Sequence, residues 1–391
     1  MTNSTNNKNI YKDNPPIIKT IGLGGAGSNA IDRMIQFQID GVDFIAANTD
    51  KQALNLSEAN TKLLLGKDFT KGHGAGGDPF IGETAAHETL NELSEIIENT
   101  DILFITCGMG GGTGTGSAPV VAELAQDLGV ITVAIVTMPF NFEGNHRYST
   151  AIQGVSILQN HCDTLITVPN ERLLQIVPHN VTLDVAFRMA DDILRQGIQA
   201  ISEIILKPGL INVDFADVRM LLHKSGGAVI AIGQGRGNSA TMDAVRSALH
   251  HPLQDISGMN YANGLLVHFT GGHELPMSHI QQAINEIRAS IGPSAQVTLG
   301  ATVEKHLKDK VQIILVATGV GGHVLDHVID ELPSKTNHIQ ITETTHNQQN
   351  LESIDEMQQV FSKYQTVQHN LDTPAFLRRN KIIDKNKTEF K

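Results

Sequence analysis

Short runs of apolar residues recur along the first half of the chain, and polar or helix-like segments separate them. Val, Ile, Leu and Phe dominate each run, and Gly, Asn, Asp or Pro bound it, which is typical of buried strands. Because apolar strands that alternate with helices form a mostly parallel sheet with both faces covered, the pattern predicts an α/β fold. The predicted strands of this half are residues 17–21, 42–47, 101–107, 131–136 and 164–168.

A long segment in the middle of the chain carries apolar residues at helical spacing. It runs from Asp184 to about Leu206 and stops at Pro208 and Gly209, which are typical helix terminators. We expect one long amphipathic helix here. Shorter helices are predicted at residues 30–37 and 83–98 and from residue 117 onward. After the long helix, a second α/β section is predicted, with strands at residues 228–232, 264–269, 296–300 and 311–317 and helices at 241–249 and 277–289.

Composition fits a soluble globular protein and narrows its partners. The chain has 391 residues, 40% hydrophobic and 18% charged, which is enough for two domains with sizeable cores. The net charge of −12 argues against a protein that binds nucleic acid or an anionic membrane. The polar N-terminus and the short, interrupted apolar run at residues 130–140 predict neither a signal peptide nor direct membrane insertion. Cys107 and Cys162 lie in apolar surroundings, which favours buried thiols and a cytoplasmic protein.

The composition changes at both ends of the chain. Residues 1–16 are rich in Asn and Lys, and residues 321–370 in Gln, Asn, His and Thr, so we expect a disordered N-terminal tail and a flexible linker. Residues 371–391 begin with a small apolar patch and end in a basic tail, because residues 378–391 hold six basic and two acidic side chains. An apolar patch on a flexible tether is typical of a docking peptide.

Glycine dominates residues 108–116, which lie between a predicted strand and a predicted helix. Such a stretch is unsuited to the interior of a helix or strand, because each glycine costs backbone entropy and adds no side chain to pack. A strand, a bare glycine loop and a helix together present free N–H groups and a positive helix end to an anion. Thr113 and Thr115 add hydroxyl donors, so the loop predicts a site for a di- or triphosphate.

The chain contains two further glycine-rich loops. Residues 22–27 spell G-x-G-x-x-G, a pattern shared by dinucleotide and mononucleotide sites, and residues 70–79 form the other loop. The loop at residues 22–27 lacks the lysine of a P-loop. Asp50 stands where a Rossmann dehydrogenase holds a ribose, so an NAD-dependent dehydrogenase built on residues 22–27 stays open as an alternative. All these loops follow the carboxyl ends of strands, where parallel sheets bind ligands.

Four motifs, in this order, resemble the FtsZ family of bacterial tubulin homologues. They are Asn48-Thr49-Asp50, the glycine loop of residues 110–116, Pro-Phe-Asn-Phe-Glu-Gly at residues 139–144 and Asn-Val-Asp-Phe-Ala-Asp-Val-Arg at residues 212–219. The resemblance covers about residues 17–320 and again 371–379. It implies a tubulin-like, Rossmann-type GTPase domain at residues 17–183, a long central helix at 184–208 and a smaller α/β domain at 209–320 with an activating loop at 209–219.

The resemblance also implies a role for individual residues. Glu143 and Arg147 would hold the ribose and phosphate side, and Phe187 would stack on guanine. Asn29, Asn170 and Asp191 would read the base edges, and a carboxylate suits guanine because it can accept from both N1–H and the 2-amino group. Asn48 and Asp50 would line the same pocket. Phosphate contacts are implied for Gly25, Ala26, Gly27, Ser28, Asn29, Ala75, Gly76, Gly77, Gly110, Gly111, Gly112, Thr113 and Gly114.

Hydrolysis also needs groups that position a water, and the candidates are Asn212, Asp214 and Asp217. They follow a predicted helix of about 22 residues, roughly 33 Å long, that begins beside the guanine. The loop therefore does not easily reach the γ-phosphate of its own molecule. We expect head-to-tail assembly, in which the loop of one subunit completes the site of the next and a filament forms. A non-polymerising GTP-binding regulator of the same fold is a further alternative, which these three residues argue against.

Cofactors and partners follow from the same resemblance. It implies GTP or GDP with Mg²⁺, because the phosphate loops contain few cations, and a monovalent cation is a further candidate. The partners are other copies of the chain and, through its C-terminal peptide, membrane-tethering and regulatory division proteins at the mid-cell division site in the cytoplasm. The peptide residues implied to bind them are Asp372, Pro374, Phe376, Leu377, Arg378 and Arg379.

Overall fold

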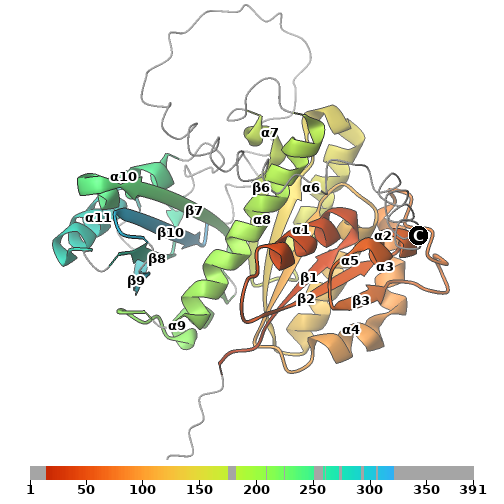
Figure 1. Ribbon diagram of the computed structural model, residues 1–391. Coiled ribbons are helices and arrows are strands. Elements are labelled where there is room, and N and C mark those ends of the chain that lie inside the picture. Colours follow the sequence, from red (N-terminus) through yellow and green to blue (C-terminus); the bar gives the residue numbers. More distant parts are fainter. Residues whose placement is uncertain are drawn as a thin grey trace, which may run out of the picture. The chain divides into compact units, whose positions relative to one another are not determined.

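A computed structural model describes residues 15–174, 182–207, 209–223, 225–250, 259, 261–272, 275–291, 295–304 and 307–320. These residues form a ten-stranded sheet with the strand order β3-β2-β1-β4-β5-β6-β7-β10-β8-β9 (Figure 1). Most of the predicted N-terminal tail, and all of the predicted linker and C-terminal peptide, lie outside the described residues. The strands are β1 Ile18–Leu23, β2 Val42–Asn48, β3 Thr61–Leu64, β4 Ile102–Gly108, β5 Ile131–Met138, β6 Thr164–Pro169, β7 Gly226–Arg236, β8 Gly264–Gly271, β9 Gln296–Val303 and β10 Lys310–Thr318.

The direction of the strands changes along the sheet. Every neighbouring pair from β3 to β7 is parallel, which confirms the predicted mostly parallel α/β sheet. β10 runs antiparallel to both β7 and β8, whereas β8 and β9 are parallel. The pairing of β6 with β7 is short, with Thr164 opposite Gly226 and Leu165 opposite Gly227. The α/β sections before and after the long helix thus share one sheet.

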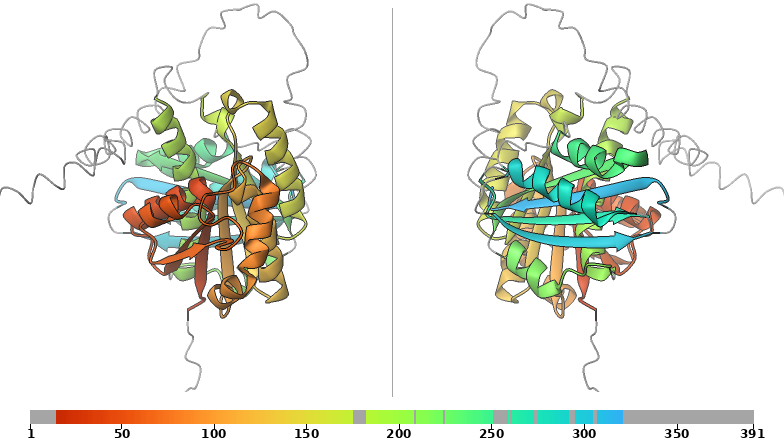
Figure 2. Two further views of the ribbon diagram at one scale, coloured as in Figure 1. Left: turned by 90° about the vertical axis from the view of Figure 1, so that its right-hand side faces the viewer. Right: turned by 90° about the vertical axis from the view of Figure 1, so that its left-hand side faces the viewer.

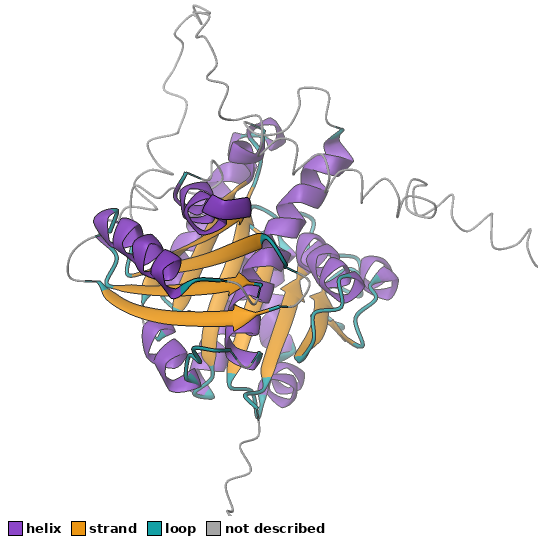
Figure 3. Cartoon of the chain, turned by 60° about the vertical axis from the view of Figure 1, so that its left-hand side comes forward, coloured by secondary structure: helices purple, strands orange, loops and turns teal. Residues whose placement is uncertain are grey.

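Helices pack against both faces of this sheet (Figures 2 and 3). Ile31 and Met34 of α1 and Leu194 and Ile198 of α8 are buried in the core on one face, and α3 to α6 contribute to the core on the other. A third core lies between β7–β10 and α10 and α11. The helices are α1 Gly24–Gln36, α2 Lys51–Leu56, α3 Pro79–Glu88, α4 Leu90–Ile97, α5 Thr113–Asp127, α6 Asn145–Gln159, α7 Asn170–Leu173, α8 Leu183–Leu206, α9 Phe215–Leu222, α10 Ala240–Leu249 and α11 Met277–Ala289.

Three predicted helix boundaries are wrong. The helix predicted from residue 30 begins at Gly24, and the one predicted from residue 117 begins at Thr113, so both glycine loops are partly the first turns of helices. The helix predicted at residues 83–98 is two helices, because Thr89 departs from helical geometry. The Thr89 hydroxyl accepts from the buried N–H of Gly66 and donates to Ala85 O, and this long-range contact fixes the break.

Candidate functional site

The G-x-G-x-x-G segment, in which β1 runs directly into α1, is packed tightly on its inner side and open on its outer side. A Cβ atom at Gly22 would lie 2.3 Å from Gly27 O, and one at Gly27 would lie 2.6 Å from Thr106 O. A Cβ atom at Gly25 would meet no atom within 4 Å, and Gly25 and its neighbour Ala26 are exposed. Because the first N–H groups of a helix lack partners within it, the start of α1 faces open space with free donors. The hydroxyl of Ser28 is buried here without a hydrogen-bond partner among the described residues.

Close contacts surround the loop between β4 and α5. Gly110 has φ +92°, and its N–H donates to the hydroxyl of Thr115 at 2.9 Å. A Cβ atom at Gly110 would lie 2.5 Å from Arg147 O, and one at Gly112 would lie 2.8 Å from Ala75 Cβ. These two glycines are therefore required by close backbone packing as well as by any ligand.

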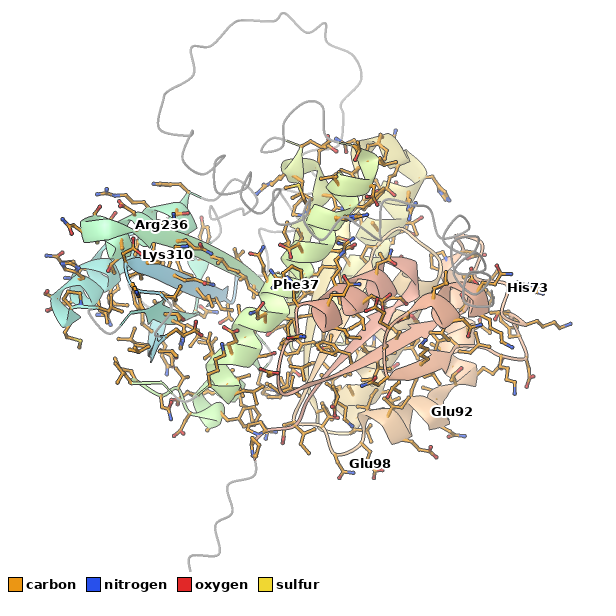
Figure 4. All side chains as sticks on the ribbon, in the orientation of Figure 1. Phe37, His73, Glu92, Glu98, Arg236 and Lys310 are labelled. Atoms are coloured by element: carbon orange, nitrogen blue, oxygen red, sulfur yellow. The ribbon has the colours of Figure 1, made fainter. Side chains whose placement is uncertain are left out.

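The third glycine-rich loop is hydrogen-bonded to the residue that follows β2. Gly74 N donates to Thr49 O at 3.1 Å, and the Thr49 hydroxyl lies 2.6 Å from that of Thr113 at the start of α5. Gly76 and Gly77 have φ +59° and +85°, and both are exposed. The structure thus brings the three predicted loops together at the carboxyl ends of β1, β2 and β4, and Figure 4 places the labelled His73 at their outer edge.

Asn48 and Asp50 serve the structure of this region. Asn48 Oδ1 accepts from the backbone N of Asp50 at 3.1 Å. The Asp50 carboxylate caps α2 by accepting from Gln52 N at 2.8 Å and Ala53 N at 3.2 Å. Both capping hydrogen bonds end on Oδ1, so Asp50 stabilises the first turn of α2 through that oxygen.

Glu143 and Arg147 form an ion pair beside the β4–α5 loop. Arg147 Nη1 lies 2.9 Å from Glu143 Oε2, and Glu143 Oε1 accepts from Phe140 N at 2.9 Å. The Arg147 side chain is 50% exposed, and its other terminal nitrogen lies 4.0 Å from the position of a Cβ atom at Gly111. The arrangement places a positive charge next to the glycine loop.

Three phenylalanines form a cluster near the start of α8. The Phe187 ring lies edge-on to those of Phe140 and Phe142, with centroids 5.4 Å and 6.4 Å away. Phe140 is fully buried, whereas Phe187 is 37% exposed and presents part of its ring to solvent. Asn170, the first residue of α7, is buried, and its Oδ1 has no hydrogen-bond partner in the part of the chain that the structure describes. An aromatic ring and an unsatisfied amide oxygen suit a planar base with N–H donors.

Asp191 lies one helical turn from Phe187 and is paired with Arg33 of α1. Burial raises the pKa of Asp191 to about 6, although the Arg33 guanidinium, which donates from Nε at 3.0 Å, lowers it. Arg33, Phe140 and Phe142 were not predicted as members of the site. The 139–144 motif could have indicated the two rings, whereas no local signal connects Arg33 with Asp191.

The predicted catalytic loop lies at the other end of α8. This helix has 24 residues, so it is about 36 Å long. Figure 1 shows α7 near its first residues and α9 near its last. Asn212, Asp214 and Asp217 are all exposed. Asn212 Oδ1 accepts from Gly209 N at 2.7 Å, and Asp214 and Asp217 occupy the N-cap and first turn of α9. Within one molecule, the structure does not bring these residues to the glycine loops.

The described residues show neither a metal cluster nor a membrane-spanning helix. They contain no group of three or more His, Cys, Asp or Glu side chains arranged to hold a metal ion. No helix in this part of the chain is long and apolar enough to cross a membrane. Both cysteines are free thiols, as predicted, with Cys107 buried and Cys162 partly buried.

Comparisons with known proteins identify relatives along most of the chain. A model of the Tubulin/FtsZ family GTPase domain matches residues 17–178, and a model of the FtsZ family C-terminal domain matches residues 226–321. Cell division protein FtsZ from Coxiella burnetii is 44% identical over 306 residues, which are 78% of this chain and 79% of that protein.

Solved structures of related proteins also match this chain. An empty FtsZ dimer from M. jannaschii matches with a TM-score of 0.74 and 43% identity, over 79% of this chain and 90% of that one. CetZ2 from Haloferax volcanii, in a GTPγS-bound protofilament, matches with a TM-score of 0.66 and 21% identity, over 80% of this chain and 98% of that one. The second match shows a shared fold only.

Proposed function

The chain belongs to the FtsZ branch of the Tubulin/FtsZ family of GTPases, and we propose that it hydrolyses GTP when it assembles head-to-tail into filaments of the bacterial division ring. The observation that supports assembly is the length of α8, which separates the glycine loops from Asn212, Asp214 and Asp217. The family membership leaves no support for the dehydrogenase alternative. The relative from Coxiella burnetii is a cell division protein, and we extend that role to this chain.

In this proposal the three glycine loops hold the phosphates. The starts of α1 and α5 supply free N–H donors and positive helix ends, and the exposed Gly25, Gly76 and Gly77 leave room for close approach. Arg147 adds a positive charge beside Gly111. The unsatisfied hydroxyl of Ser28 and the open space over Gly25 fit an anion at this position.

The base lies at the start of α8 in this proposal. Phe187 stacks on guanine, and the Asp191 carboxylate accepts hydrogen bonds from the base. The unsatisfied Oδ1 of Asn170 is a second acceptor. Arg33 keeps Asp191 ionised against the effect of burial, so it supports selection of guanine from outside the pocket.

Mg²⁺ would be held by the phosphates, because the residues that the structure describes offer no cluster of carboxylate ligands. When bound, the ion supplies charge neutralisation to phosphoryl transfer. The loop of Asn212, Asp214 and Asp217 orients the attacking water on the neighbouring subunit's GTP. Such a head-to-tail contact does not close on itself, so it extends into a filament.

The first test is GTP hydrolysis against protein concentration, with Mg²⁺ present and polymer pelleted in parallel. We expect a threshold, with activity per molecule rising as polymer appears. A constant activity per molecule without polymer would instead identify a complete site in each molecule, as in a non-polymerising regulator. In the same assay, Asp217→Ala should abolish turnover and leave GTP binding intact. A loss of both turnover and binding would contradict the proposal that Asp217 acts on the GTP of the neighbouring subunit.

We also propose that residues 371–391 attach the filament to its partners. The apolar side chains of Pro374, Phe376 and Leu377 next to Arg378 and Arg379 suit a groove-binding peptide, and many copies along one filament multiply a weak affinity. Deleting residues 371–391 should preserve GTP turnover in solution and abolish ring attachment at mid-cell. An unchanged ring in cells would contradict the docking role.

A further inference from the structure

Polar side chains along α8 form a continuous chain of hydrogen bonds. Arg195 Nε donates to Asp192 Oδ1 at 2.6 Å, and its Nη1 donates to Gln199 Oε1. Gln199 Nε2 donates to Glu203 Oε1 at 2.8 Å, and Lys207 Nζ donates to the same oxygen at 3.0 Å. Because these residues are three or four positions apart, they share one face of the helix. Arg195 also lies 4.2 Å over the ring of Phe37, which Figure 4 labels between α1 and α8.

The chain of hydrogen bonds ends at Lys207, which joins α8 to β9. Lys207 is the C-cap of α8, and its Nζ also donates to Glu304 Oε1 at 3.0 Å, directly after the last residue of β9. Burial lowers the pKa of Lys207, but the hydrogen bonds and charges of Glu203 and Glu304 raise it by more. The ammonium group is therefore charged at neutral pH and bridges two carboxylates.

The activating loop, residues 209–219, follows Lys207 and is hydrogen-bonded to β9. Ile211 and Ala301 of β9 exchange two backbone hydrogen bonds, of 3.2 and 3.0 Å. A Cβ atom at Gly209 would lie 2.5 Å from Ala301 O, so the backbones touch. The loop that carries Asn212 thus has two attachments on one strand end, at Ala301 and at Glu304.

We propose that Lys207 is a positioning residue for GTP hydrolysis, which aligns the loop of Asn212, Asp214 and Asp217 by bridging Glu203 and Glu304. This inference rests on the proposed function, in which that loop acts on the GTP of the next subunit. Lys207 contacts neither nucleotide nor water in this role. It fixes the angle at which the loop leaves α8, and through Glu304 it makes that angle depend on the position of β9.

A purely structural role for Lys207 makes a different prediction. Its side chain is 43% exposed, and half-exposed ion pairs contribute little to the stability of a fold. If the Lys207 bridge only supported the fold, its loss would therefore change the stability and the rate of GTP hydrolysis little. Loss of alignment is different, since a displacement of about 1 Å near a reacting group costs up to roughly 100-fold in rate.

The test compares Lys207→Met with Lys207→Arg in the full chain. Arg can still reach both carboxylates, whereas Met keeps the unbranched apolar part of the side chain and removes the donor. The measurements are kcat and KM for GTP per pelleted subunit and the Kd of the monomer for GTP. Lys19→Met is the matched control, because Lys19 Nζ also has two partners, Ile96 O and Glu98 O, away from the loop.

For Lys207→Met we expect kcat per polymerised subunit to fall about 10-fold, with KM and Kd unchanged. Lys207→Arg should retain most of the wild-type kcat, and Lys19→Met all of it. If Lys207→Met does not assemble alone, it is co-assembled with wild-type protein, and turnover should fall in proportion to the variant's share of the pellet. Glu304→Gln, which weakens the same bridge, should lower kcat less than Lys207→Met does.

A wild-type kcat per polymerised subunit in Lys207→Met would overturn the positioning role. Asp217→Ala in the same assay separates this failure from that of the proposed function. If Asp217→Ala is inactive and Lys207→Met is active, only the inference about Lys207 is wrong. If Asp217→Ala itself turns over GTP at the wild-type rate, the activating loop is wrongly assigned.

Discussion

Asp191 of α8 and Arg33 of α1 form an ion pair across 158 positions of sequence, with 3.0 Å between Arg33 Nε and Asp191 Oδ2. Both side chains are largely buried. Burial raises the pKa of the carboxyl to about 6, and Arg33 keeps it from rising further. In the proposed site, burial and a neighbour in a different helix together set the charge state of Asp191.

This pair predicts how GTP affinity depends on pH. Only the ionised carboxylate accepts from both N1–H and the 2-amino group of guanine, so affinity should be constant above pH 7 and should fall as the pH drops through about 6. The loss approaches about tenfold per pH unit, because one proton is coupled to binding. Fluorescence titration with a labelled GTP from pH 7.5 to pH 5 measures it.

Asp191→Asn is the matched control, because an amide oxygen still accepts one hydrogen bond and does not titrate. Its affinity should be lower at pH 7.5 and should vary less with pH. The same raised pKa makes the nucleotide-free fold less stable as the pH rises from about 4 to about 6, since the folded state holds the proton more tightly there. A wild-type affinity that ignores pH over this range would contradict the role of Asp191.

Substitution by Ala should change the stability of the protein in opposite directions at Gly25 and at Gly22. Gly25 lies in the first turn of α1 with open space at its Cβ position, so Gly25→Ala should raise stability slightly, by up to about 1 kcal/mol. It should lower GTP affinity at least about tenfold, since a methyl group would occupy the space over the phosphate loop and displace a phosphate contact. Calorimetric GTP titration and urea unfolding measure the two effects.

Gly22→Ala is the comparison, because a Cβ atom there would lie 2.3 Å from Gly27 O. Overpacking of this kind costs about 1–3 kcal/mol, so this variant should unfold at lower urea. If Gly25→Ala binds GTP as tightly as wild type, the phosphates do not approach this glycine.

The sequence predicts the parts of the fold that depend on local pattern. The runs that form β4 and β5 consist mostly of apolar residues, so their positions follow from the residues alone. α6 has no predicted counterpart, because it buries only Ala151, Gly154, Val155 and Leu158 and shows no broad apolar stripe. Gly154 is needed there for close packing, since its Cβ would lie 2.3 Å from Thr115 Cγ2.

In the candidate site too, only the features that depend on local pattern can be predicted from the sequence. Glycine loops after strands predict a phosphate site because backbone donors need no particular side chain. Contacts between distant segments have no such local signal. The Thr49–Thr113 hydroxyl pair, the Arg33–Asp191 ion pair and the Lys207–Glu304 bridge each join residues more than 60 positions apart. A single sequence does not contain that information in its local pattern.

Asp163 and His223 lie within hydrogen-bond distance of each other, and the two residues should differ in their effect on stability. Asp163 Oδ1 lies 2.8 Å from His223 Nδ1, and its Oδ2 accepts from the backbone and the hydroxyl of Thr132 at 3.0 and 3.1 Å. Asp163→Ala should cost about 3 kcal/mol, because it leaves the buried N–H of Thr132 without a partner. His223→Gln should cost less than about 1 kcal/mol, since the imidazole is half-exposed.

Urea unfolding followed by circular dichroism compares the two variants. Asp163→Asn is the control, because its amide oxygen can still accept from Thr132, and it should lie between the other two. Equal losses in Asp163→Ala and His223→Gln would show that the pair stabilises the protein mainly through the His223 contact.

His268 of β8 predicts a loss of stability in mild acid. The side chain is buried, its Nε2 lies 3.0 Å from the Thr302 hydroxyl, and its Nδ1 has no hydrogen-bond partner in the described structure. Burial lowers the pKa of His268 to about 4, while Glu203 raises it and Lys207 lowers it further. The unfolded chain binds a proton below about pH 6.5, where the folded protein does not. Stability is therefore fully present above that pH and is lost as the pH falls toward 4.

We expect the free energy of unfolding of the nucleotide-free protein to fall by about 2 kcal/mol more between pH 7 and pH 5 in wild type than in His268→Asn. Asn can still bond Thr302 and does not titrate, so it isolates the imidazole. The opposite contribution of Asp191 is present in both proteins and cancels in the comparison. Urea unfolding at several pH values measures the two slopes. Equal slopes would mean that the buried imidazole takes up a proton in the folded protein as readily as in the unfolded chain, and its burial would then have no effect on its titration.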